Sequence, residues 1–401
     1  VGFPAVMVPG CNTSVKRISG SVEEKFVGFM AELESLYKVK LSLPPDFSPA
    51  ALKSFCSGLL EGGCHPWRVA ISASRLSDDS RWSLSFSLFL FRKVIPSEAP
   101  SVGAYLDKMS VPGDPPDPKF LRFALRTVNR LFPVGWDRSY LGRVTSATLP
   151  LSSCYESARV MGGCRGLTEQ YRMDRDEFCS YVTESVVPRH RGRSRVTAVD
   201  TGGKWRIISI PPRIDNALRP LHHAMYDQIS RCGWLLRGDA KASRFSRFRR
   251  VDGEVFVSGD YESATDNLNS TLQTAILHRL LGNARRVPDG IRYHALSIFE
   301  SSLEGPEGVT VQRRGQLMGQ LTSFPLLCLI NYITFKYSIP RDVPVKINGD
   351  DIVFRCTESE RLSWFKNVAV GGLTLSAGKT LVSPKYFSLN SSLFKACGRR
   401  A

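Results

Sequence analysis

The sequence predicts an α+β fold built around an antiparallel sheet, and three observations lead to this prediction. Residues 345–354 place β-branched apolar runs on both sides of an Asn-Gly pair, which is the strongest short-range signal for a β-hairpin. Residues 254–260 form a second short β-prone run that ends in an acid. Apolar residues at helical spacing mark residues 22–37, 119–132 and 268–281.

Length and charge narrow the class of protein. The chain has 401 residues, with 54 Lys and Arg against 37 Asp and Glu, and a formal net charge of +17. This excess favours a polyanionic partner, with nucleic acid ahead of an anionic membrane surface. No apolar run approaches the roughly 20 residues that a membrane span needs, and no secretory signal is evident. The chain starts at Val1 rather than Met, and we expect a fragment or a trimmed product.

The ten cysteines are scattered and form no CxxC pair. This pattern argues against a zinc ribbon and fits reduced thiols in a cytosolic setting. Cys56, Cys64 and His65 lie close together in the sequence. No fourth ligand is evident nearby, so we expect no zinc site there.

The first part of the chain carries helical patterns and no catalytic motif. Ser48-Pro49 begins a predicted helix that ends at Gly62-Gly63. Residues 82–91 alternate Ser with Leu and Phe, which is typical of a strand or a buried segment. The proline-rich residues 111–118 form a stiff loop and the best candidate for an internal boundary.

A basic stretch begins near residue 188 and leads into a predicted hairpin. Gly202-Gly203 makes a tight turn between two β-prone runs, and Lys204 and Arg206 follow it. Residues two apart on a strand point the same way, so both cations face one side. This arrangement suits the binding of a triphosphate. The alternative is a solvated basic hairpin. Four arginines precede the turn: Arg189, Arg191, Arg193 and Arg195.

Residues 231–250 combine cations with aromatic side chains. Cations for phosphates and aromatic faces for bases are typical of single-strand binding. In the alternative, the aromatic rings are core and the charged chains reach outward from it. The members are Arg231, Trp234, Arg237, Lys241, Arg244, Phe245, Arg247, Phe248, Arg249 and Arg250.

Acidic residues lie where the predicted strands end. Asp260 ends one strand, and Asp350-Asp351 occupy the hairpin tip. Two adjacent carboxylates repel each other unless a cation such as Mg²⁺ neutralises them. If the strands are neighbours, Asp260 comes beside Asp350, and three carboxylates on a metal pair suit in-line displacement at phosphorus. The alternative is a solvated acidic turn. Thr265 or Asp266 is the predicted N-cap of the helix that follows.

Three segments together resemble a known family. They read Ser-Gly-Asp-Tyr-Glu-Ser-Ala-Thr-Asp-Asn at 258–267, Arg-Gly-Gln-Leu-Met-Gly-Gln-Leu-Thr-Ser-Phe-Pro at 314–325, and Asn-Gly-Asp-Asp at 348–351. In this order they resemble motifs A, B and C of viral RNA-dependent RNA polymerases. The sequences of these motifs are most similar to those of the ourmia-like (botourmiavirus) branch, near the narnaviruses. Residues 202–208 resemble motif F, 373–379 motif D and 386–394 motif E.

The resemblance implies a right-hand polymerase with an antiparallel palm sheet and basic fingers. It implies a palm over residues 251–397 with a finger insertion at about 282–312, and fingers over 165–250. Residues 1–164 are then a largely helical N-terminal extension that packs on the fingers, or an unrelated helical domain. A thumb is expected to be missing, reduced or supplied by the N-terminal region.

The implied reaction is template-directed transfer of a nucleotidyl group from an NTP to an RNA 3′-hydroxyl. The resemblance assigns two Mg²⁺ ions, with Mn²⁺ as a substitute, to Asp260, Asp350 and Asp351. It assigns the triphosphate to Lys204 and Arg206.

Other implied roles fall on the remaining motifs. Asp266 would recognise the ribose 2′-hydroxyl. Lys379 would protonate the departing pyrophosphate, with Lys385 as the alternative proton donor. The family pattern places an Asn in the motif B helix where this chain has Leu327. Asn331 or Ser323 is therefore expected to serve at the nucleotide. RNA contacts are expected at Arg193, Arg195, Arg244, Arg247, Gly315 and Gly319.

Two alternatives remain at this point. A reverse transcriptase shares the palm, but Asn348-Gly349 stands where those enzymes usually carry an aromatic residue. A non-catalytic RNA-binding protein could carry a decayed palm, yet none of the three acids is lost. The expected partners are RNA and NTPs. The expected location is the host cytoplasm, and the mitochondrion remains open.

Overall fold

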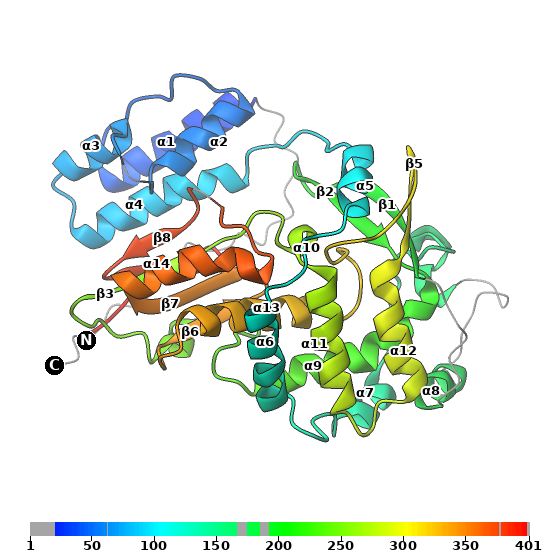
Figure 1. Cartoon of the computed structure of the whole chain (residues 1–401). Helices are drawn as coiled ribbons and strands as arrows, with labels where there is room; N and C mark the ends of the chain where they lie inside the picture. The colour runs from blue at the N-terminus through cyan, green and yellow to red at the C-terminus, as the bar shows by residue number, and fades with distance from the viewer. Residues whose placement is uncertain (1–20, 62, 167–174, 185–191, 377, 399–401) are drawn as a thin grey trace.

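The computed structural model describes residues 21–61, 63–166, 175–184, 192–376 and 378–398. Figure 1 shows a cluster of N-terminal helices beside a larger α+β body. The mixed α+β class with an antiparallel-rich sheet is confirmed. No helix in the described ranges is long and apolar enough to cross a membrane.

The N-terminal helices form a module with its own core. Phe26, Leu52 and Trp67 are almost completely buried inside it. Of the two alternatives for residues 82–91, the strand is wrong and the buried segment is confirmed, because Ser77 caps a helix there and the apolar positions 84, 88 and 91 are buried on one helical face. The module contains α1 (Val22–Tyr37), α2 (Pro49–Gly58), α3 (Pro66–Ala73), α4 (Asp78–Leu90) and the 3₁₀ turn η1 (Phe91–Lys93).

The predicted basic hairpin forms one end of a second sheet. Strands β1 (Arg193–Asp200) and β2 (Trp205–Ile210) pair antiparallel around the Gly202-Gly203 turn. β4 (Ser302–Gly305) and β5 (Gly308–Val311) extend the sheet, in the order β2-β1-β4-β5. Helix α5 (Val102–Ser110) packs on β4 and β5 through Val102 and Leu106.

Helices surround the main core. The N-cap of α11 is Asn269, which accepts a hydrogen bond from the Leu272 N–H (2.9 Å), so the expected caps Thr265 and Asp266 are wrong. The helices are α6 (Pro118–Leu131), α7 (Tyr140–Ser146), α8 (Arg175–Thr183), α9 (Arg219–Ser230), α10 (Ala264–Asn267), α11 (Ser270–Gly282), α12 (Asp289–Ser297), α13 (Ser323–Ser338) and α14 (Glu358–Asn367). The 3₁₀ turns are η2 (Arg159–Met161), η3 (Gly163–Arg165), η5 (Arg213–Leu218), η6 (Ala242–Phe245), η7 (Ile298–Glu300) and η8 (Val368–Gly371).

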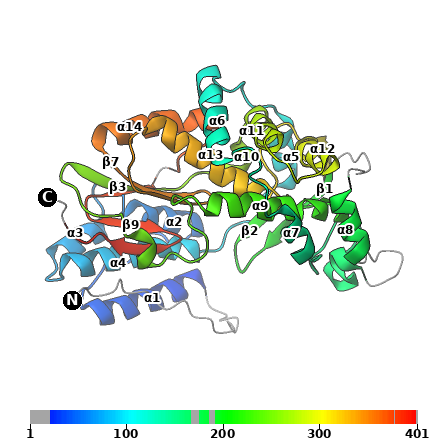
Figure 2. The same cartoon turned by 90° about the horizontal axis from the view of Figure 1, so that it is seen from below.

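The central sheet has the order β6-β7-β3-β8 and is antiparallel throughout. Val257 and Phe354 face the core shared with α13 and α14, and Phe256 and Val353 face the hairpin of β9 and β10. Figure 2 shows α13 and α14 on one side of the sheet and β9 with the N-terminal helices on the other. The strands are β3 (Glu254–Gly259), β6 (Val345–Asn348), β7 (Asp351–Thr357), β8 (Leu381–Ser383), β9 (Tyr386–Leu389) and β10 (Ser392–Lys395).

The hydrophobic cores indicate which helices belong to the same structural unit. Helices α1–α4 have a separate core, whereas α6 and α7 bury their apolar faces in the core shared with α11 and α13. The predicted division at residues 164 and 250 stays a prediction.

Candidate active site

The acidic hairpin forms as predicted. Asn348 and Asp351 pair across a two-residue turn, in which Gly349 adopts φ +66°. In the neighbouring strand pair, Gly259 faces Ile352, so the next residue, Asp260, comes opposite Asp351. The register of β3 against β7 therefore unites acids that lie far apart in the sequence.

Buried polar groups lock this turn against the helix behind it. Asn331 is completely buried; its Nδ2 donates to the Gly349 carbonyl (3.1 Å) and its Oδ1 accepts from the Tyr261 hydroxyl (2.8 Å). The Gly349 N–H donates to Cys328 Sγ (3.2 Å). One side chain of α13 thus connects the segment after β3 with the β6–β7 turn.

The three carboxylates influence one another. Burial raises the pKa of Asp351 to about 6, and the charges of Asp350 and Asp260 add to the rise. Burial and the charge of Asp260 also raise the pKa of Asp350, although its side chain is partly open to solvent. Carboxylates that destabilise each other's charge are stabilised by a cation between them.

The donor set fits Mg²⁺. In the described residues, no three His, Cys, Asp or Glu side chains form a ready-made metal cage. Mg²⁺ is usually held by one or two carboxylates together with waters and substrate phosphates, rather than by a closed protein cage. Asp260, Asp350 and Asp351 supply hard oxygen ligands of that kind.

Lys379 reaches the acids from the segment that precedes β8. Its Nζ lies 3.8 Å from Asp260 Oδ2. The segment is tied down because the Ser376 N–H donates to the Asp260 carbonyl (2.9 Å) and Tyr261 bridges to Leu375. The predicted proton donor therefore stands beside the first acid.

The two cations predicted to bind the triphosphate lie on the β1–β2 hairpin. Lys204 is half-buried and Arg206 is exposed. Burial lowers the pKa of Lys204, and the neighbouring charges of Lys93, Lys53 and Arg206 lower it further. Two of those neighbours, Lys53 and Lys93, come from the N-terminal module, which the sequence did not implicate.

The charged partner of Asp266 in the structure is Lys108. Burial raises the pKa of its carboxyl, and Lys108 of α5 lies 3.8 Å from it and opposes that rise. Gly315 packs directly on the Asp266 backbone, where a Cβ would come within 2.8–3.0 Å of three backbone atoms. The fold thereby brings the segments of Asp266 and Gly315 into direct contact.

Two residues expected at the nucleotide lie in the interior. Asn331 uses its amide within the protein, as described above. Ser323 is buried at the start of α13 and donates to the Leu317 carbonyl (3.3 Å). Asn331 thus holds the acidic turn and Ser323 the helix start, and the nucleotide contact predicted for them stays a prediction.

Gly319 also serves packing. It adopts φ +118°, and a Cβ there would overlap the Ser209 carbonyl oxygen of β2. The Ser209 N–H donates to the Met318 carbonyl (2.9 Å). Both glycines, Gly315 and Gly319, allow a close approach to protein backbone, and the RNA contact predicted for them stays a prediction.

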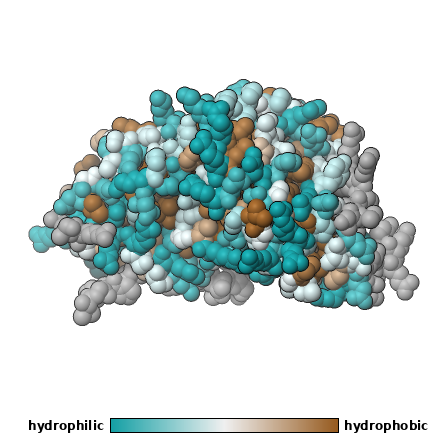
Figure 3. Space-filling view, turned by 60° about the horizontal axis from the view of Figure 1, so that its bottom comes forward, coloured by the Kyte–Doolittle hydropathy of each residue, from teal (hydrophilic) through white to brown (hydrophobic). Residues whose placement is uncertain are grey.

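The expected single-strand surface divides into two parts. Trp234, Phe245 and Phe248 are buried, so the prediction that they stack on bases is wrong and the core alternative is confirmed. Arg244 and Arg247 remain exposed beside them. Figure 3 shows a face on which hydrophilic residues predominate, with hydrophobic ones in small separate groups.

Other arginines flank the basic hairpin. Arg193 and Arg195 are exposed on β1, and their guanidinium carbons lie 3.7 and 5.6 Å from the Tyr155 ring centroid. Stacking of this kind orients a guanidinium, and Arg195 Nη2 also donates to the Cys154 carbonyl (3.1 Å). Arg189 and Arg191 lie outside the described residues.

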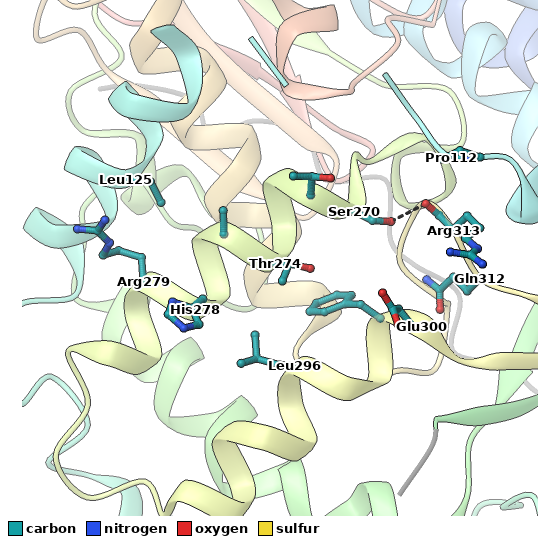
Figure 4. Close-up of a pocket in the computed structure, with 13 residues that line it drawn as sticks. Pro112, Leu125, Ser270, Thr274, His278, Arg279, Leu296, Glu300, Gln312 and Arg313 are labelled. Atoms are coloured by element: carbon teal, nitrogen blue, oxygen red, sulfur yellow. Dashed lines mark hydrogen bonds between the residues drawn. The ribbon is translucent and has the colours of Figure 1, made fainter. Parts of the chain in front are cut away.

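A separate cavity of about 750 Å³ opens between α11 and α12. Figure 4 shows Thr274 and His278 of α11 facing Leu296 and Glu300, with Gln312 and Arg313 beside Glu300. None of the predicted site residues lines it.

An antiparallel sheet that carries acids at a strand end and at a hairpin tip, beside a basic hairpin, is the arrangement of a palm-type nucleotide polymerase. The comparisons with known proteins agree with this class. A solved RNA-dependent RNA polymerase of a human picorbirnavirus matches 92% of this chain and 77% of its own, with a TM-score of 0.53 and 14% identity. Its insertion-loop deletion mutant gives a TM-score of 0.51 at the same identity, over 92% of this chain and 71% of its own. These likenesses establish the fold.

Sequence relatives specify the branch. The chain is 34% identical over 231 residues to the RNA-dependent RNA polymerase of Ourmia melon virus, covering 49% of this chain and 27% of that protein. It is 31% identical over 163 residues to the RNA-directed RNA polymerase of Saccharomyces 23S RNA narnavirus, covering 36% and 17%. No family model matches the chain. The resemblance to viral polymerases of this branch is confirmed, and the matches span about a quarter or less of the relatives' lengths.

Proposed function

We propose that this chain carries the catalytic centre of an RNA-dependent RNA polymerase that replicates a viral RNA genome. The single observation that carries the proposal is the register of β3 against β7, which sets Asp260 opposite the Asp350-Asp351 turn. The similarity to the Ourmia melon virus polymerase supports the same reaction. By that resemblance, the reaction belongs in the host cytoplasm.

The residues divide the work of nucleotidyl transfer. Asp260, Asp350 and Asp351 would hold two Mg²⁺ ions, which when bound lower the pKa of the attacking hydroxyl and stabilise the leaving oxygen. The RNA 3′-oxygen forms a bond to the α-phosphorus, the bond to the β-phosphate oxygen breaks, and pyrophosphate leaves. Lys204 and Arg206 bind the triphosphate and orient it for in-line attack.

Further residues complete the step. Lys379, beside Asp260, donates a proton to the leaving pyrophosphate. Asp266 accepts a hydrogen bond from the ribose 2′-hydroxyl, and Lys108 holds its carboxylate in position. Arg193 and Arg195 contact the phosphates of the template strand.

The experiment is Mg²⁺-dependent incorporation of labelled NTPs on a short single-stranded RNA, with dNTPs in parallel. Asp350→Asn removes one acid, and Asp252→Asn makes the same change at an exposed position before the other end of β3. We expect ribonucleotide product with wild type and Asp252→Asn, none with Asp350→Asn, and equal RNA binding by all three.

Other outcomes of the incorporation assay would favour other functions. Incorporation of dNTPs in preference to NTPs would favour a reverse transcriptase. Product from Asp350→Asn at the wild-type rate would contradict the metal assignment. RNA binding by wild type without product under any metal would favour a binding protein.

A further inference from the structure

We propose that Arg92 and Lys93 of the N-terminal module bind the triphosphate of the incoming nucleotide together with Lys204. The inference rests on the proposed function, and it assigns a task to a part of the chain that carries no polymerase motif. Four lines of structure support it.

The first is that the two cations stand on a fixed turn. Phe91 packs in the N-terminal core, with its ring 4.7 Å from Phe26 in an edge-to-face contact. Ile95 is buried in the same core. Because both flanking positions are anchored, the backbone that carries Arg92 and Lys93 in η1 has little freedom to turn away from the palm.

The second is a chain of contacts from Lys93 to the catalytic acids. Lys93 Nζ donates to Ser391 Oγ at 2.6 Å, in the tight β9–β10 turn. The neighbouring residue, Asn390, donates its backbone N–H to the Asp351 carboxylate. The β9–β10 turn therefore connects Lys93 to Asp351 through the adjacent residues Ser391 and Asn390. Lys93 itself remains exposed.

The third is the unused hydrogen-bonding capacity of Arg92. The residue is only 7% exposed, its guanidinium lies 4.1 Å from the Phe89 centroid, and its buried Nε has no hydrogen-bond partner in the described residues. Burial lowers its pKa, and the charges of Asp260 and Asp351 oppose that shift. A buried cation of this kind is stabilised by an anionic ligand.

The fourth is that the same segment holds the turn of the β1–β2 hairpin. The Ser97 N–H donates to the Gly203 carbonyl, and Ser97 Oγ accepts from the Trp205 N–H, both at 2.9 Å. Lys204 lies between the two bonded residues, Gly203 and Trp205. Burial lowers the pKa of Lys204 most, and the charges of Lys93 and Arg92 lower it further.

The cluster selects its ligand by charge density. Like charges gathered at one place repel, and a compact polyanion relieves that repulsion. A nucleoside triphosphate concentrates its negative charge on three linked phosphates, whereas an RNA strand spreads its charge at one per nucleotide. The adjacent acids, which would hold the metal ions of a bound nucleotide, favour the triphosphate as the ligand.

The module is also docked firmly enough to present these residues. Asp79 of α4 accepts from the Tyr386 hydroxyl and from Lys395 Nζ, both at 2.5 Å. The Trp82 ring lies 4.9 Å from the Tyr386 ring. Figure 2 shows α4 beside the β9 side of the palm.

The test compares Lys93→Met with Lys93→Arg and with Lys40→Met, which removes an exposed cation elsewhere on the module. Loss of one charge-assisted contact predicts about a tenfold rise in the NTP KM for Lys93→Met, with a smaller change in kcat and in RNA affinity. Lys93→Arg is expected to recover most of the loss, and Lys40→Met to match wild type. Arg92→Gln, checked by its melting temperature, is expected to raise the NTP KM as well.

A second readout does not require catalysis. Equilibrium binding of a fluorescent GTP analogue with Mg²⁺ to the protein without RNA should weaken about tenfold in Lys93→Met. If wild type makes no RNA but binds the analogue and Lys93→Met does not, the proposed function fails while this inference stands. Unchanged NTP binding and KM would overturn it, and weaker RNA binding in that case would reassign Lys93 to the RNA strand.

Discussion

The buried Asn331 side chain is the part of the site whose contribution is easiest to calculate from the structure. Asn331→Leu keeps a side chain of similar size but leaves the Gly349 carbonyl and the Tyr261 hydroxyl without their partner. A buried polar group left unpaired costs about 1–3 kcal/mol, so the free energy of unfolding should fall by about 2–6 kcal/mol. Polymerase activity should fall with it, because the Asp350 turn loses its support.

Tyr261→Phe isolates half of this arrangement. It leaves only Asn331 Oδ1 unpaired, so the free energy of unfolding should fall by about 1–3 kcal/mol. The double variant should lose less than the sum of the two, by about 0.5–3 kcal/mol, because both changes break the same hydrogen bond. Urea unfolding followed by fluorescence measures all three values.

This experiment separates the two roles considered for Asn331. If Asn331→Leu unfolds at the same urea concentration as wild type while its discrimination between NTPs and dNTPs collapses, Asn331 contacts the nucleotide and the structural role is refuted. A loss of stability that is coupled to Tyr261→Phe supports the role seen in the structure.

Three other predictions concern packing and charge. Gly319→Ala combines a positive φ with overlap on the Ser209 carbonyl, and we expect it to lower the free energy of unfolding by about 1–3 kcal/mol in urea. The pKa of Glu360 is lowered to about 2, chiefly by its hydrogen bond to Arg341. Its stabilising contribution is therefore present above the ordinary Glu pKa near 4.5 and is lost as the pH falls toward 2, so urea midpoints at pH 6 and pH 3 should differ less in Glu360→Gln than in wild type. Phe248→Ala removes a core ring and should lower the free energy of unfolding by about 3–5 kcal/mol, whereas a ring that stacked on bases would mainly affect RNA affinity.

The local features of the site follow from the sequence because short-range chemistry decides them. The Asn348-Gly349 pair tolerates the positive φ of its turn, so the hairpin is predictable from a few residues. The same holds for the Gly202-Gly203 turn, where both glycines adopt positive φ.

Features that depend on distant contacts did not follow from the sequence. Phe245 and Phe248 alternate with arginines in a pattern that fits RNA binding or a core equally well, and only their packing under the palm sheet decides between the two. No motif marks Arg92 and Lys93 in the sequence. Their place near the acids depends on the docking of α4 on the β9–β10 hairpin. Residues 82–91 misled because Ser alternates with Leu and Phe as on a strand, while the apolar positions 84, 88 and 91 also repeat at helical spacing.

The central claim is that Asp260 and the Asp350-Asp351 turn form one divalent-metal site. It is tested most directly by Mn²⁺ binding in the presence of an NTP, followed by electron paramagnetic resonance, in wild type, Asp260→Asn, Asp350→Asn and Asp252→Asn. The β3–β7 register predicts that Asp260→Asn and Asp350→Asn each weaken Mn²⁺ binding at least about tenfold, while Asp252→Asn binds as wild type does. Wild-type affinity in Asp260→Asn, with loss only in Asp350→Asn, would contradict a shared site.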